Sequence, residues 1–109
     1  MKIRLLIPTM LFLTRLLFAQ TSLIWYPGGN AAASAGAIET ALAGHVSSVA
    51  KTTSLSSFTL TPANYDYVFV CLGVNPNNYV LDSTNDSNAI QKLTDFLNLG
   101  GNLYMEGGD

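Results

Sequence analysis

Three short apolar segments, each closed by turn-forming residues, dominate the pattern of the chain. Residues 23–26 end at Pro27-Gly28-Gly29-Asn30, residues 67–72 end at Gly73, and residues 102–105 lie between two Gly-Gly pairs. The segment at 67–72 is apolar at every position, which is typical of a strand covered on both faces, as in parallel sheets. Glycine and proline at the boundaries mark turns. The pattern therefore predicts three buried strands.

A helix is expected over residues 31–43, which are rich in alanine and carry Ile38 and Leu42 four positions apart. Asn30 is the expected N-cap, and Gly44 stands where a helix commonly ends on a left-handed glycine. Alanine and glycine would let this helix pack closely against a sheet.

A second helix is expected to begin at residues 86–88 and to end before Gly100. Its apolar positions follow the spacing i, i+3, i+6, i+7, which is one face of a 3.6-residue period, and they are Ile90, Leu93, Phe96 and Leu97. Lys92 and Asp95 fall on the other side, so we expect them to face solvent.

The remaining segments give weaker signals. Val46 and Val49 predict a further strand within residues 45–50, although they do not alternate cleanly. The Ser/Thr-rich residues 52–61 and the Asn-rich residues 74–85 are expected to be loops, the first of them on the surface.

Strands that alternate with helices predict a parallel sheet with right-handed crossovers. We therefore expect an α/β fold, a flavodoxin-like doubly wound parallel sheet of about four strands in the order 2-1-3-4, with flanking helices. The last strand would lie at an edge with no helix after it, which indicates an incomplete domain, the N-terminal part of a longer one.

The first 19 residues resemble a secretory signal peptide. Lys2 and Arg4 form a basic start, residues 5–18 are mostly apolar, and Ala19 is the expected cleavage point. The rival interpretation is an uncleaved membrane anchor, which the shortness of the run and its interruption by Arg15 disfavour. The sequence thus predicts a secreted or cell-surface protein whose domain occupies residues 20–109, with no membrane association after cleavage.

Removal of this leader makes the chain strongly acidic. Lys51 and Lys92 remain against seven acidic residues, so the net charge becomes −5. Without a basic patch to neutralise phosphates, nucleic acid is excluded as a partner. The single cysteine, Cys71, excludes an intrachain disulfide.

Residues 65–70 (Tyr-Asp-Tyr-Val-Phe-Val), the following helix and residues 100–104 (Gly-Gly-Asn-Leu-Tyr) are similar to the class I glutamine-amidotransferase-like superfamily. The resemblance is greatest to its non-enzymatic modules in large secreted bacterial proteins. It covers residues 65–109 well and residues 23–60 in outline.

Active members of that superfamily carry a nucleophilic cysteine in a strand-to-helix elbow, which the resemblance places near Glu106-Gly107-Gly108. This chain has no cysteine there, and no histidine follows. The resemblance therefore implies the fold, an amidotransferase-like α/β domain, and puts activity in doubt.

Ligands of open α/β sheets bind beyond the carboxyl ends of the strands. Polar residues expected at that edge form a candidate ligand site without catalytic residues, metal or cofactor, and they are Gly28, Gly29, Asn30, Asn75, Glu106 and Asp109. The competing interpretation is that the glycines form tight turns and the carboxylates face water.

Three further features have structural explanations. Cys71 lies within the most apolar run and is expected to be an inert core residue, and His45 is expected to interact with a helix C-terminus. Residues 82–88 are rich in oxygen ligands that calcium prefers, but side chains competing for a helix N-cap explain the same composition.

The leading hypothesis is a secreted, non-catalytic α/β module that binds a ligand or has a structural role within a larger exported protein, beside neighbouring domains of the same chain. The alternative is a fragment of a hydrolase or amidotransferase-like enzyme whose catalytic residues lie beyond residue 109. A third possibility is a homo-oligomer that pairs the exposed edges of its last strands.

Overall fold

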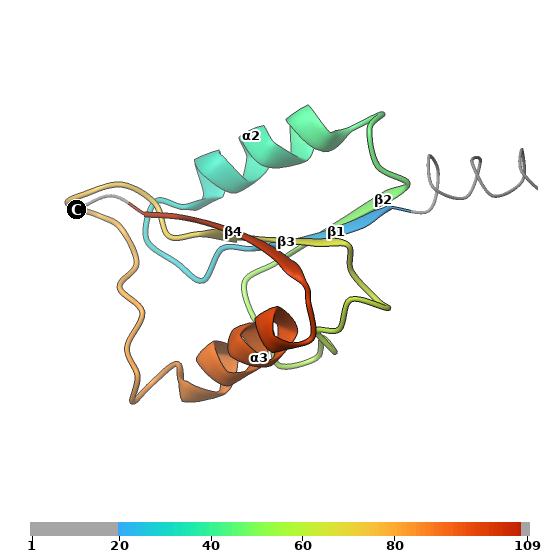
Figure 1. Cartoon of the computed structure of the whole chain (residues 1–109). Coiled ribbons are helices and arrows are strands. Elements are labelled where there is room, and N and C mark those ends of the chain that lie inside the picture. Colours follow the sequence, from blue (N-terminus) through green and yellow to red (C-terminus); the bar gives the residue numbers. More distant parts are fainter. Residues whose placement is uncertain (1–19, 108–109) are drawn as a thin grey trace, which may run out of the picture.

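The computed structural model describes residues 20–107, which form a four-stranded parallel sheet in the order β2-β1-β3-β4 (Figure 1). The elements are β1 Thr21–Trp25, α2 Ala32–Leu42, β2 Ser48–Thr52, β3 Tyr67–Cys71, α3 Ser87–Asn98 and β4 Asn102–Glu106. The predicted α/β class and strand order are confirmed. The predicted signal peptide and Asp109 lie outside the described residues.

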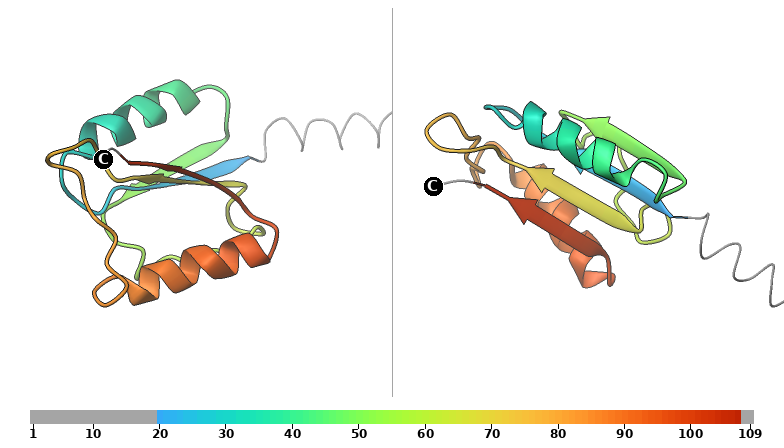
Figure 2. Two further views of the ribbon diagram at one scale, coloured as in Figure 1. Left: turned by 60° about the vertical axis from the view of Figure 1, so that its left-hand side comes forward. Right: turned by 90° about the horizontal axis from the view of Figure 1, so that it is seen from above.

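The sheet separates two apolar layers because successive side chains of a strand point to opposite faces. On one face, α2 packs against β1, β2 and β3, and Ile24, Ala35 and Cys71 are fully buried. On the other face, α3 packs against β4, and Leu23 and Phe96 belong to the larger cluster. Figure 2 shows the two helices on opposite sides of the sheet.

The start of α2 differs from the prediction. The N-cap residue is Ala31 rather than Asn30, and no side chain caps the helix. The Asn30 side chain instead bonds to Val74, 44 residues away, with its Oδ1 accepting from the Val74 N–H at 2.7 Å. Gly44 follows the C-cap with a φ of 83°, as predicted.

β2 begins three residues later than the predicted strand. The N–H groups of His45 and Val46 both donate to the Leu42 carbonyl, so these residues continue the turn that closes α2. The strand therefore starts at Ser48 and extends to Thr52.

The prediction of a surface loop over residues 52–61 was wrong at two positions. Leu55 and Leu60 are 3% and 6% exposed and belong to the core on the α3 face. The connection from β2 to β3 forms no helix, and these leucines cover the sheet there instead.

The buried face of α3 is rotated from the predicted one. Leu93 and Phe96 are buried and Ala89 packs against the same cluster, whereas Leu97 is 49% exposed. Lys92, expected to face solvent, reaches toward the β2–β3 connection. Neither α2 nor α3 is long and apolar enough to span a membrane, and no other helix occurs within residues 20–107.

Candidate functional site

The crossover direction of the chain reverses between β1 and β3, and the loops that follow these strands meet there. Such a switch point is the usual ligand site of a doubly wound sheet. Here the two loops are joined directly. The Asn30 amide donates to the Val74 carbonyl at 3.0 Å and accepts from the Val74 N–H, and the Asn30 N–H donates to the Asn77 carbonyl at 3.0 Å.

The predicted glycine turn takes part in this closure. Gly29 has a φ of 63°, and a Cβ on it would clash with the Asn77 carbonyl oxygen. The N–H of Ala31 donates to Gly28 within the turn. The N–H groups of Asn30 and Ala31 are therefore engaged by the chain itself rather than presented to an anion.

The other predicted site residues are distributed along the carboxyl edge of the sheet. Asn75 is exposed in the same loop as Val74 and Asn77. Glu106 ends β4, with β3 between it and β1, and its register partner is Cys71. The structure thus brings Gly28, Gly29 and Asn30 together with the loop that contains Asn75. Glu106 lies apart from them, beside Cys71.

Cys71 is fully buried, as predicted. Burial, the negative charge of Glu106 and a hydrogen bond to it raise the pKa of the Cys71 thiol from 9.0 to about 11. The thiol is therefore protonated at neutral pH and is a poor nucleophile. His45 lies near the amino ends of the strands, at the other end of the sheet from the candidate site. The N–H of Ser47, two residues later, donates to the Gln20 carbonyl just before β1.

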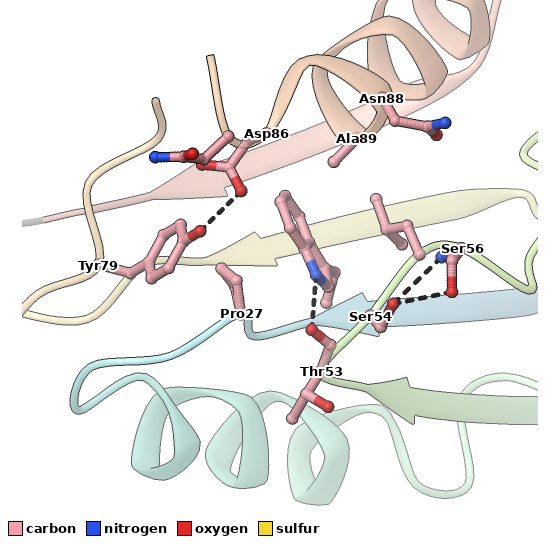
Figure 3. A pocket seen from close by; sticks show the side chains of 11 residues that line it. Pro27, Thr53, Ser54, Ser56, Tyr79, Asp86, Asn88 and Ala89 are labelled. Carbon is pink, nitrogen blue, oxygen red and sulfur yellow. Dashed lines mark hydrogen bonds between the residues drawn. The ribbon is translucent and has the colours of Figure 1, made fainter. Parts of the chain in front are cut away.

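An open pocket of about 330 Å³ lies next to the closed switch point, between the ends of β1 and β2 and the start of α3 (Figure 3). Its apolar lining includes Trp25, Pro27, Leu55 and Ala89. Its polar lining consists of hydroxyl, amide and carboxylate side chains, which belong to Thr53, Ser54, Ser56, Tyr79, Asn85, Asp86 and Asn88. No pattern in the sequence predicted this pocket.

The lining is ordered by local hydrogen bonds. The Trp25 indole N–H donates to the Thr53 carbonyl at 3.2 Å, which fixes the ring at the end of β1. Ser54 and Ser56 exchange a hydroxyl hydrogen bond at 3.0 Å. Opposite them, the Tyr79 hydroxyl donates to Asp86 Oδ1 at 2.6 Å, as Figure 3 shows.

The Tyr79–Asp86 pair has a defined protonation state. Hydrogen bonds from the Asp82 N–H and then from Tyr79 lower the pKa of Asp86. The bond to this carboxylate is also the main cause of the raised pKa of Tyr79. At neutral pH the pocket therefore presents an ionised carboxylate and a protonated phenol.

The oxygen-rich residues 82–88 form a closed turn. Asp82 accepts hydrogen bonds from the Thr84 N–H at 2.7 Å and from the Asn85 amide at 2.8 Å, while Asp86 accepts from Asp82 and Tyr79. The carboxylate oxygens of both residues thus already have donors. Across residues 20–107, no group of three or more His, Cys, Asp or Glu side chains is arranged to hold a metal ion.

Comparison of the chain with models of protein families, with curated proteins and with solved structures finds no match. The resemblance to the amidotransferase-like superfamily therefore stays a prediction from the sequence.

Proposed function

We propose that this protein is an exported, non-catalytic binding module and that the pocket between Trp25 and Asp86 is its ligand site. The observation that carries the proposal is the Asp86 carboxylate, fixed by Tyr79 and facing serine hydroxyls beside an apolar patch. Pockets that combine apolar walls with a few oriented polar groups are typical small-molecule sites.

The chemistry of the pocket supports binding rather than catalysis. A general acid or base works best when its pKa lies near the working pH. The pKa of Asp86 is lowered and that of Tyr79 is raised, so both shifts lead away from neutrality. The Cys71 thiol is buried and belongs to the cluster on the other face of the sheet.

The lining favours a small, neutral ligand rich in hydroxyl groups, such as a monosaccharide or another polyol. The pocket has no Lys or Arg among its lining residues, and Asp86 would repel an anion. Each Asp86 carboxylate oxygen keeps one lone pair beside its present donor, so a ligand hydroxyl can donate there and also accept from the amides of Asn85 and Asn88. The Trp25 side would contact the apolar face of such a ligand.

Titration of the protein from Gln20 onward with a panel of neutral sugars and polyols, followed by NMR, tests this proposal. Binding should shift the signals of the Trp25 indole N–H and of Ala89. Asn88→Ala should weaken binding by about fivefold to tenfold, because it removes one hydrogen-bonding amide. Asn98→Ala, at the other end of α3, is the matched control and should leave binding unchanged.

Two outcomes would contradict the proposal. Shifts that do not cluster around Trp25 and Ala89 would exclude the pocket as the ligand site. Hydrolysis or amide transfer by the purified protein, lost when Glu106 is changed, would instead favour the enzyme alternative.

A further inference from the structure

β4 ends the described sheet with an open edge. The Glu106 carbonyl accepts a hydrogen bond from the Leu72 N–H at 3.0 Å, so the backbone of Glu106 faces β3. Successive residues of a strand direct their N–H and C=O groups to alternate sides. The polar backbone groups of Leu103 and Met105 therefore point outward, away from β3.

The side chains along this edge are partly apolar and exposed. Tyr104 is 52% exposed and Met105 is 46% exposed. Helix α2 packs against the other three strands and leaves β4 uncovered on that face (Figure 2, right). The centroids of the Tyr104 and Phe69 rings lie 5.8 Å apart. Lysine, proline or a bulge usually protects such an edge, and residues 102–106 contain neither lysine nor proline.

We propose that β4 pairs antiparallel with β4 of a second copy of this chain, about a twofold axis at Tyr104. In this register Leu103 of one copy lies opposite Met105 of the other. Both residues direct their backbone groups outward, so each such pair exchanges two hydrogen bonds. The two Tyr104 residues face each other in the non-hydrogen-bonded position, where cross-strand side chains come closest.

The charge along β4 favours the same register. Glu106 is the one ionisable acid or base among residues 102–106 other than the Tyr104 phenol. Centring the pair on Tyr104 places Glu106 opposite Asn102 of the second copy, an acceptor beside an amide. Centring it on Glu106 would place two carboxylates opposite each other, which is destabilising. Registers centred on Leu103 or Met105 would shorten the overlap of the two strands.

Self-association is measured by sedimentation equilibrium on the protein from Gln20 onward, which contains every described helix and strand. The wild type should show a monomer–dimer equilibrium between micromolar and millimolar concentrations. Tyr104→Lys and Tyr104→Glu should each weaken the dimer by about tenfold or more, because like charges then face each other. An equimolar mixture of the two variants should restore a dimer. Ser48→Lys, at an exposed position of β2 on the opposite side of the sheet, is the control and should leave the dimer intact.

A second variant tests the backbone pairing. Met105→Pro removes an outward N–H while leaving the bonds to β3, a substitution that edge strands accept. It should also yield a monomer, with circular dichroism confirming the folded state. A wild-type protein that stays monomeric at every concentration overturns the proposal. β4 would then be an edge that pairs with a chain other than a second copy of this one. Failure of the Lys and Glu variants to associate with each other, although the wild type dimerises, overturns the register.

Discussion

Gly29 shows how a single residue determines the geometry beside the pocket. Its φ of 63° is in the left-handed region, and the Asn77 carbonyl occupies the space that a Cβ would need. In the Pro27-Gly28-Gly29-Asn30 turn, Gly29 thus has a packing role: it lets two loops approach closely.

Gly29→Ala should therefore lower the free energy of unfolding by about 2 kcal/mol or more, from the conformational strain and the required shift of the Asn77 loop. Urea unfolding followed by the fluorescence of Trp25 measures the change. Gly36→Ala provides a control of opposite sign, because a Cβ there meets no atom within 4 Å and alanine stabilises a helix interior by about 0.5–1 kcal/mol. Equal effects of both substitutions would contradict this account.

Cys71 makes the fold less stable as the pH becomes alkaline. Its pKa is about 11 in the folded protein against 9.0 for a free thiol, so the folded state retains a proton that the unfolded state loses. The stabilising contribution is complete below pH 9 and is lost as the pH rises toward 11. Unfolding free energies at pH 7, 9 and 10.5 should fall more steeply for the wild type than for Cys71→Ala. Parallel curves would show that the thiol does not titrate differently in the two states.

At the scale of elements, Lys92 joins α3 to the β2–β3 connection. Its ammonium group donates to the carbonyls of Leu55, Ser56 and Phe58 at 2.9, 3.3 and 2.8 Å. These bonds hold a turn that carries a buried leucine and lines the pocket. A helical wheel alone assigns Lys92 to the solvent side because the residue is charged. A lysine can nevertheless bury its stem and still use its charged end in this way.

Lys92→Met should destabilise the protein by about 1–3 kcal/mol, since hydrogen bonds to a charged donor are lost while the stem volume is kept. Lys51→Met is the control, because Lys51 forms a surface salt bridge with Glu39 at 3.1 Å that contributes about 0–1 kcal/mol. Both values come from urea unfolding at neutral pH. A smaller loss for Lys92 than for Lys51 would contradict the proposed role of Lys92 at the turn.

The elements that could be predicted are those with local signals. The unbroken apolar run at 67–72 and the glycines after both helices mark boundaries that the structure confirms. Leu55 and Leu60 stand five positions apart among serines and threonines, with neither helical nor strand periodicity. Their burial depends on the absence of a helix in that connection, which no short-range pattern reveals.

The pocket escaped prediction for a related reason. Its lining comes from the end of β1, the β2–β3 connection, the loop before α3 and the first turn of α3. Each segment is polar for its own local reason, such as the turn closed by Asp82 and Asp86. Trp25, at the carboxyl end of β1 and two residues before Pro27, was the available signal, because ligands of open α/β sheets bind beyond the carboxyl ends of the strands.

At the scale of the whole molecule, the described fold begins immediately after the predicted leader. β1 starts at Thr21, and the Gln20 carbonyl already accepts a hydrogen bond from Ser47 at 2.8 Å. Cleavage after Ala19 would therefore release a chain that contains all the described elements. Three of the five basic residues lie in the leader, so the released protein would carry a charge of −5.

Expression of the full chain in a bacterial host with a secretory pathway tests this prediction. Intact-mass measurement of the exported protein should give an N-terminus at Gln20, and the protein should partition with the soluble fraction. Ala19→Arg should block processing, because signal peptidases require a small residue at the cleavage point. Ala33→Arg, at an exposed position of α2, is the control and should be processed normally. A wild-type protein that keeps its first 19 residues and sediments with membranes would establish the anchor interpretation instead.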